Sequence, residues 1–307
     1  MTITTPPTQR WLGNMTYLPG TGTVLFGGKT TANINNSLLN DTWVWNGTQW
    51  NQLSATGPSA RNESALSYDG YGLTLTCGAD PFSNLNDSWF FNGTAWSLLS
   101  NGTGLPLIPK TSPVKVKSSV LSYMSSTGKA YMFGGKSFTT KYMVDTWSWN
   151  KNTNTWALLS PASSPVGRAY HCQDSSPNKL VMFGGMNYGG SLSDTWTFDG
   201  TFWTSVATTV APSARYGASM VYDSSTSLFV LFGGITTNGY NNETWTFNPA
   251  TNVWTNIVVA GPPQRGFAQI AFDSVANRVV LFGGLRYDTD YNDTWLFNST
   301  SNTWTQQ

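Results

Sequence analysis

Short apolar runs recur along the chain, and five of the six end in a pair of glycines. Typical copies are TVLFGG at residues 23–28, KLVMFGG at 179–185 and RVVLFGG at 278–284. Runs of this length and composition are typical of buried β-strands, and the glycines indicate a strand end that needs positive φ. The second glycine of the pair recurs at intervals of 50, 57, 50, 49 and 50 residues, at Gly28, Gly78, Gly135, Gly185, Gly234 and Gly284. The chain therefore contains six copies of one unit, with Cys77 in place of the first glycine in the second copy.

A second phrase follows each apolar run and alternates polar and aromatic positions. It reads DTWVWNGTQW at 41–50 and DTWTFDGTFW at 194–203, with a polar turn between two tryptophans. This pattern predicts a β-hairpin. The first tryptophans are Trp43, Trp89, Trp147, Trp196, Trp245 and Trp295, and the second are Trp50, Trp96, Trp156, Trp203, Trp254 and Trp304. We expect these pairs to pack between neighbouring units, because each ring buries a large apolar area.

A third mark opens each unit. The pattern Pro-x-x-Arg supplies Arg10, Arg61, Arg168, Arg215 and Arg265, and the third unit carries Val116 instead. Each unit then reads as four strands: A after the arginine, B up to the glycine pair, and the hairpin of C and D. A meander of this kind cannot bury both of its faces alone, so the units must stack around an axis. The sequence predicts an all-β fold, a six-bladed β-propeller with four antiparallel strands per blade.

We expect a single domain over residues 1–307. The predicted blades are 8–57, 58–112, 113–164, 165–211, 212–261 and 262–307. Residues 1–7 are expected to complete the ring beside strand D of the sixth blade, which places the two termini close together.

These marks resemble the kelch repeats. The shared features are the strand-B Gly-Gly pair, the strand-C aromatic, a strand-D tryptophan 7–9 residues later and the repeat length. The resemblance covers essentially the whole chain in six copies and implies a kelch-type propeller. The motif sequence is similar to that of kelch repeats in secreted or surface proteins of microbes. It does not specify a function, because propellers carry many.

Composition narrows the function classes. Charged residues make up 10% of the chain and the net charge is +1, whereas an average soluble chain carries about 25% charged residues. We therefore expect neither a nucleic-acid partner nor membrane insertion, since no apolar run approaches the roughly 18–20 residues of a membrane span. No signal peptide is visible in MTITTPPTQR. Cys77 and Cys172 are too few for a disulfide framework and are expected to be buried thiols.

Eleven Asn-x-Ser/Thr sequons are candidate glycosylation sites. They are Asn14, Asn35, Asn40, Asn46, Asn62, Asn86, Asn92, Asn101, Asn242, Asn292 and Asn298. Several follow from the repeat itself, but all are predicted to fall on turns and loops. Together with the scarcity of Lys and Glu, they favour an extracellular setting or the surface of a cell or virion.

Two sets of residues are candidates for ligand contact at one mouth of the channel. The arginines Arg10, Arg61, Arg168, Arg215 and Arg265 lie where the D–A loops enter the innermost strands. They are expected either to bond the strand-C acids and the backbone or to contact a ligand. The B–C loops, predicted on the same face, carry the aromatics Phe82, Phe138, Tyr142, Tyr188, Tyr240, Tyr287 and Tyr291. These rings would suit a glycan or a protein hot spot, or would simply pack the loops.

Catalysis has little support in the sequence. A copper site similar to that of galactose oxidase needs two histidines, and the chain has only His171. We therefore predict no metal and no cofactor. A six-bladed relative, the sialic-acid mutarotase type, works by acid–base chemistry in the channel. Glu63 and His171 depart from the repeat on strand A and are the weak candidates for such a pair. Most of the other acids are assigned to the six-fold strand-C set or to A–B turns, the latter including Asp174, which leaves Asp80, Asp199, Asp288 and Asp290.

The sequence thus favours a non-catalytic recognition or structural propeller. Its predicted partner is a protein or a glycan bound by the B–C and D–A loop face, with a subunit of a surface assembly as a further possibility. The alternative is a mutarotase-like carbohydrate isomerase acting in the channel.

Overall fold

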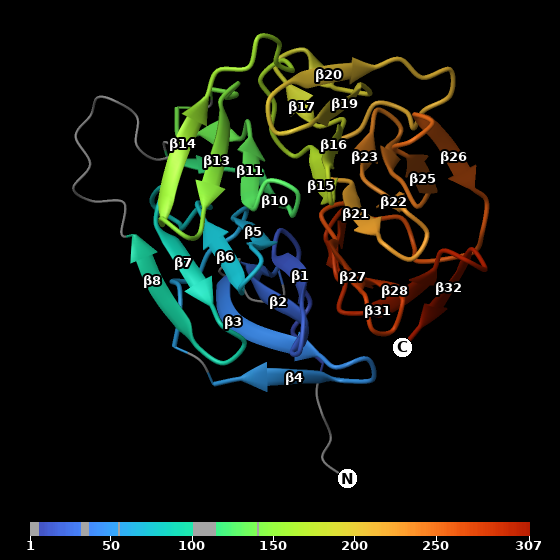
Figure 1. Ribbon diagram of the computed structural model, residues 1–307. Coiled ribbons are helices and arrows are strands. Elements are labelled where there is room, and N and C mark those ends of the chain that lie inside the picture. The colour runs from blue at the N-terminus through green and yellow to red at the C-terminus, as the bar shows by residue number, and fades with distance from the viewer. Residues whose placement is uncertain (1–5, 32–36, 55, 101–114, 140) are drawn as a thin grey trace.

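The computed structural model describes residues 6–31, 37–54, 56–100, 115–139 and 141–307. Six four-stranded antiparallel sheets are arranged as blades around a central axis (Figure 1). In every sheet the strands follow chain order from the centre to the rim. The predicted fold class is therefore confirmed.

The first three blades contain fourteen strands, twelve in the four-stranded sheets and two in a short ribbon. Blade 1 comprises β1 (Asn14–Leu18), β2 (Gly22–Lys29), β3 (Leu38–Trp45) and β4 (Trp50–Leu53). Blade 2 comprises β5 (Ala65–Tyr68), β6 (Leu73–Thr76), β7 (Ser88–Phe91) and β8 (Trp96–Ser100). Blade 3 comprises β10 (Val120–Met124), β11 (Lys129–Phe133), β13 (Thr146–Asn150) and β14 (Thr155–Leu159). The short strands β9 (Val116–Lys117) and β12 (Lys136–Ser137) pair with each other beside this blade.

The other three blades repeat the plan, each with an additional two-stranded ribbon in its B–C loop. Blade 4 comprises β15 (Cys172–Ser176), β16 (Lys179–Phe183), β19 (Thr195–Phe198) and β20 (Trp203–Val206), with β17 (Met186–Asn187) and β18 (Gly190–Ser191). Blade 5 comprises β21 (Ser219–Asp223), β22 (Leu228–Phe232), β25 (Thr244–Asn248) and β26 (Val253–Ile257), with β23 (Ile235–Thr236) and β24 (Gly239–Tyr240). Blade 6 comprises β27 (Gln269–Asp273), β28 (Arg278–Phe282), β31 (Thr294–Asn298) and β32 (Thr303–Gln306), with β29 (Leu285–Arg286) and β30 (Thr289–Asp290).

Each four-stranded sheet lies within one of the predicted blade ranges. Blade 6 obtains its outermost strand, β32, from the C-terminal end of the chain. Blade 1 lies next to blade 6, because the Arg10 N–H donates to the Tyr291 carbonyl at 3.1 Å. The predicted contribution of residues 1–7 falls largely outside the described residues.

The B strands are continuous apolar runs because both of their faces are covered. Val24, Leu25 and Phe26 of β2 are all fully buried, with neighbouring blades on either side. At the end of strand B, the chain must pass close to the next blade. A Cβ atom on Gly184, whose φ is +64°, would lie 2.6 Å from the Arg215 carbonyl oxygen. This approach explains the glycine that the repeat places there.

The strand-D tryptophans join each blade to the one before it. The Trp50 indole N–H of blade 1 donates to Thr294 Oγ1 of blade 6 at 2.9 Å, and its ring lies 5.2 Å from Phe282. The same bond, at 2.9–3.0 Å, links the pairs Trp96–Thr42, Trp203–Thr146, Trp254–Thr195 and Trp304–Thr244. Strand-C tryptophans such as Trp43 belong to the same inter-blade clusters. The prediction that the tryptophans pack between blades is confirmed.

Replacing Trp50 by alanine is expected to lower the free energy of unfolding by about 3–5 kcal/mol, because it removes a buried ring and a buried hydrogen bond at the point of ring closure. Trp156→Ala is the matched control, since Trp156 is only partly buried. Urea unfolding followed by fluorescence measures both. An equal loss in the two variants would contradict the special role of Trp50.

Candidate functional site

The five repeat arginines are internal anchors of their blades. The Arg10 guanidinium donates to both carboxylate oxygens of Asp41, at 2.6 and 2.8 Å, and to the Gly27 carbonyl at 3.1 Å. The equivalent ion pairs are Arg61–Asp87, Arg168–Asp194, Arg215–Glu243 and Arg265–Asp293, at 2.5–2.6 Å. All five arginines are fully buried. The possibility that they contact a ligand is therefore corrected: they hold strand C and the end of strand B together.

Four of the acids in these pairs have lowered pKa values and are ionised at neutral pH. Burial alone would raise the pKa of Asp41, but the Arg10 guanidinium and the Trp43 indole N–H outweigh it and hold that pKa below its usual range. The pKa values of Asp194, Glu243 and Asp293 are lowered against burial in the same way. Each pair thus joins a fully buried guanidinium to a carboxylate that stays 16–37% exposed, with additional hydrogen bonds to both groups.

Arg215→Met is expected to reduce the free energy of unfolding by about 1–3 kcal/mol, because it leaves the buried Gly233 carbonyl without its partner, whereas water can solvate the 37% exposed Glu243 side chain. Arg286→Met serves as the control, since Arg286 is exposed and an exposed substitution is expected to change stability by no more than about 0.5 kcal/mol. Guanidinium unfolding of the two variants tests this. A small effect at position 215 would argue against the anchor role.

A closed ring of backbone hydrogen bonds surrounds the channel next to these anchors. In each blade, one residue donates its N–H to the carbonyl of the equivalent residue in the preceding blade, at 2.7–3.3 Å. This residue lies two positions after the repeat arginine, or two positions after Val116 in blade 3. All six have positive φ, between 55° and 62°. They are Leu12, Glu63, Ser118, Tyr170, Gly217 and Phe267. One residue of each blade takes part, so this ring, called the mouth ring below, encircles the channel.

The side chains of the mouth ring differ from blade to blade. On one side, Glu63 is paired with Lys117 Nζ at 3.0 Å and accepts a hydrogen bond from the Ser118 hydroxyl. On the other side, Phe267 contacts the rings of Tyr170 and Tyr216, with centroids 5.5 and 6.0 Å apart. Burial, followed by the nearby Glu63 carboxylate, raises the pKa of Tyr170. The mouth therefore has a polar half and an aromatic half.

Of the mouth ring, only Glu63 was a candidate from the sequence. The ring members Tyr170 and Phe267 were not, and neither were the adjacent aromatics Trp11 and Tyr216. Aligning the copies on the arginine would have shown that the second position after it holds six different residues. Backbone strain is expected at such a position when it is not glycine, and strained residues cluster at functional sites.

The predicted B–C loop aromatics lie on the same face as the mouth ring. Antiparallel bridges such as Ala169↔Met186 and Tyr216↔Ile235 join the D–A segments to the first residues of the B–C loops. The most exposed of the aromatics are Phe82 (87%), Tyr188 (76%), Phe138 (69%) and Tyr287 (65%). Tyr142, Tyr240 and Tyr291 are partly buried.

Neighbouring blades share these aromatics in pairs. Tyr142 of blade 3 meets Tyr188 of blade 4 edge to face at 4.9 Å, and Tyr240 of blade 5 meets Tyr287 of blade 6 at 5.2 Å. Tyr291 instead stacks on the buried Arg265 guanidinium at 3.9 Å. The loops are thus packed against one another while most of their rings still reach solvent.

Comparison with known proteins agrees with the repeat. The family model of the KLHDC2/KLHL20/DRC7 Kelch-repeats domain matches residues 199–307, and the same anchors and hydrogen bonds recur in the blades before that range. This match, together with six blades built on the same plan, supports a kelch-repeat propeller. No curated protein sequence matches it. Kelch propellers generally act as protein-interaction scaffolds.

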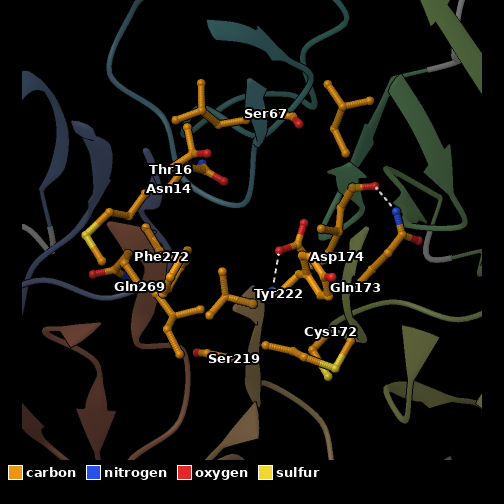
Figure 2. A pocket seen from close by; sticks show the side chains of 18 of the residues that line it. Asn14, Thr16, Ser67, Cys172, Gln173, Asp174, Ser219, Tyr222, Gln269 and Phe272 are labelled. Atoms are coloured by element: carbon orange, nitrogen blue, oxygen red, sulfur yellow. Dashed lines mark hydrogen bonds between the residues drawn. The ribbon is translucent and has the colours of Figure 1, made fainter. Parts of the chain in front are cut away.

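The channel of this kelch propeller holds a cavity of about 370 Å³, lined by the A strands (Figure 2). Asp174 of β15 lies in its wall, and the Tyr222 N–H donates to its carboxylate at 2.7 Å. The assignment of Asp174 to an A–B turn was wrong, because this residue pairs with Val181 in the middle of the strand. Burial raises the pKa of Asp174 to about 6.

The mutarotase-like alternative is not supported. His171 is buried against Phe133, and neither of its ring nitrogens has a partner in the described part of the chain. Burial lowers the pKa of His171 to about 3, so the ring is neutral. Glu63 is engaged by Lys117 and Ser118. Among the residues that the structure describes, no three His, Cys, Asp or Glu side chains group as metal ligands.

The sequons fall into accessible and inaccessible positions. Asn62 is buried, and Asn14 lies on β1 and lines the channel, with its amide donating to Ser64 Oγ. Asn40 lies within β3 and Asn298 at the end of β31. The prediction that all the sequons fall on turns and loops is therefore wrong for Asn14, Asn40 and Asn298. Asn35 and Asn101 lie outside the described residues. Asn86 and Asn298 are partly buried, and the fully exposed sequons are Asn40, Asn46, Asn92, Asn242 and Asn292.

Two further observations concern composition. Both thiols, Cys77 and Cys172, are free and buried as expected, and burial raises the pKa of each. None of the described residues forms a helix long and apolar enough to cross a membrane.

The raised pKa of Asp174 predicts a pH-dependent stability. The folded state binds the proton more tightly than the unfolded chain, whose Asp pKa is about 3.9, so stability is lost as pH rises through the interval up to about 6. Asp174→Asn removes this cost and is expected to be more stable than wild type by about 1–3 kcal/mol at pH 8, with little difference at pH 4. Thermal unfolding at the two pH values measures it. A gain that does not depend on pH would contradict the assignment.

Proposed function

We propose that this kelch propeller is a non-catalytic recognition module that binds a partner protein through its B–C and D–A loop face. The observation that carries the proposal is the set of exposed aromatic rings that surrounds the mouth ring on one face. Aromatic side chains are enriched at the energetic centres of protein interfaces, because each buries a large area at a small cost in side-chain entropy.

The way the loops are held supports this role. The edge-to-face contacts Tyr142–Tyr188 and Tyr240–Tyr287 restrict the loops before a partner arrives. Preorganisation reduces the entropy that must be lost on binding. The buried arginine anchors fix the base of each loop to the blade, so binding residues vary on top of a constant frame.

A glycan is the second candidate partner. The rings of Tyr188 and Tyr287 are largely exposed and stand among Asn, Gly and Thr side chains, which suits stacking against a sugar and hydrogen bonding to its hydroxyls. Both candidates use the same face, and the residues that bind are the same aromatics.

Replacing both Tyr188 and Tyr287 by serine is expected to weaken binding at least tenfold, because two exposed hot-spot rings are lost. Tyr71→Ser is the matched control, since Tyr71 is equally exposed (65%) but lies in the A–B turn at the opposite end of blade 2. Binding is measured on glycan arrays and by quantitative cross-linking mass spectrometry of partner proteins. Loss of binding with Tyr71→Ser, or none with the double variant, would overturn the choice of face.

We further propose that the propeller is displayed outside the cell or on a virion surface. The sparse charge and the five exposed sequons support this. The intact mass of the native protein tests it: hexose and N-acetylhexosamine increments are expected, with glycopeptides at positions such as Asn46 and Asn242 and none at Asn62. A native mass equal to that of the bare chain would remove the main support.

A further inference from the structure

The channel cavity contains one isolated carboxylate. Among the described residues that line the 370 Å³ space, Asp174 is the only Asp, Glu, Lys or Arg. The equivalent strand-A position of the other blades holds a small polar or apolar residue: Thr16, Ser67, Ser122, Val221 or Ala271. The charge is therefore a property of blade 4 alone and not of the repeat.

Nothing in the cavity wall neutralises this charge. The Asp174 carboxylate accepts a hydrogen bond from the Tyr222 backbone N–H, and it forms no ion pair with the described lysines and arginines. The other titratable groups of the wall are His171, Cys172 and the phenols of Tyr17 and Tyr222. None of them is a cation, because His171 is held neutral by burial. Asp174 is partly buried, and a carboxylate shielded from water without a nearby cation is costly, so a bound cation would supply the missing charge.

The remaining wall indicates which kind of cation fits. Met220, Ile270 and Phe272 give blades 5 and 6 an apolar surface, while Asn14, Thr16 and Ser67 bring polar groups from blades 1 and 2 (Figure 2). A divalent metal ion requires six or more oxygen ligands, usually with several carboxylates. The described wall offers a single carboxylate, and its apolar side would not bind a hydrated ion. An organic ammonium ion needs one counter-charge and an apolar surface for its carbon skeleton.

The position of the cavity separates it from the loop face. The mouth ring encircles the channel at that face and lines a second, smaller hollow of about 140 Å³, which shares Asn14, His171 and Ser219 with the cavity. The cavity instead extends along the A strands to Tyr17, Tyr222 and Ser224, near the A–B turns. A ligand would enter from that end and would leave the loop aromatics free. The volume is within the range of small-molecule sites.

We propose that the channel binds a small organic ammonium ion, with Asp174 as its counter-ion and with Met220, Ile270 and Phe272 against its carbon skeleton. The site is independent of partner binding at the loop face. Asp174 holds the ammonium group, and the Asn14, Thr16 and Ser67 side chains accept hydrogen bonds from a hydroxylated or extended ligand.

Isothermal titration with n-butylammonium chloride tests the proposal, with 1-pentanol, which is one carbon longer and more apolar, as the neutral probe. Saturable one-to-one binding of the ammonium ion is expected at pH 7.5, at least tenfold tighter than that of pentanol. Asp174→Asn, which keeps the shape of the side chain, is expected to weaken it at least tenfold. Asp288→Asn is the matched control, because Asp288 is exposed and outside the channel wall.

Each other outcome overturns the proposal in a defined way. Equal affinity in wild type and Asp174→Asn, with thermal unfolding showing that the variant is folded, would exclude the counter-ion role. Equal binding of pentanol would indicate a purely apolar cavity, and competition by calcium or potassium chloride at matched ionic strength would indicate a metal site. No detectable heat or shift in melting temperature with butylammonium would exclude the site. The Tyr188→Ser, Tyr287→Ser variant should bind the ammonium ion normally, so failure here is distinguishable from failure of the loop-face proposal.

Discussion

Closure of the ring of blades is the constraint on which the rest of this structure depends. A single four-stranded meander exposes two apolar faces, and only a neighbour on each side covers them. The Trp50–Thr294 hydrogen bond spans 244 residues and joins the first blade to the last, in the same geometry as the bonds within the series. The mouth ring closes in the same way through the Leu12 N–H and the Phe267 carbonyl. Every blade therefore depends on both of its neighbours.

The repeat divides the chain into a constant frame and a variable surface. Arginine anchors, glycine turns and rim tryptophans occupy equivalent places in almost every blade and are buried. The residues that differ between copies lie at the mouth ring, in the B–C loops and at single channel positions such as Asp174. Side chains can change at the mouth ring without loss of the frame, because the ring itself is held by backbone hydrogen bonds.

The interface between blades 2 and 3 is the irregular part of the frame. Cys77, with φ of 61°, takes the place of the first glycine, and Val116 takes the place of the anchor arginine across the interface. The backbone bond is nevertheless kept, because the Gly78 N–H donates to the Val116 carbonyl at 3.1 Å. The two departures from the repeat therefore meet at the same contact between the blades. Cys77 adds a Cβ atom there, and Val116 lacks the guanidinium group.

The sequence by itself determined the number of blades, the order of strands, the glycine conformations and the packing role of the tryptophans. All of these are periodic, and a property shared by six copies can be read from the copies. It also indicated the aromatic loops, because they break the period. Tertiary structure alone decided that the arginines are buried, that Asn14 and Asn62 are inaccessible and that Asp174 faces the channel. The physical reason is that exposure depends on neighbours from other blades, which no pattern within one repeat specifies.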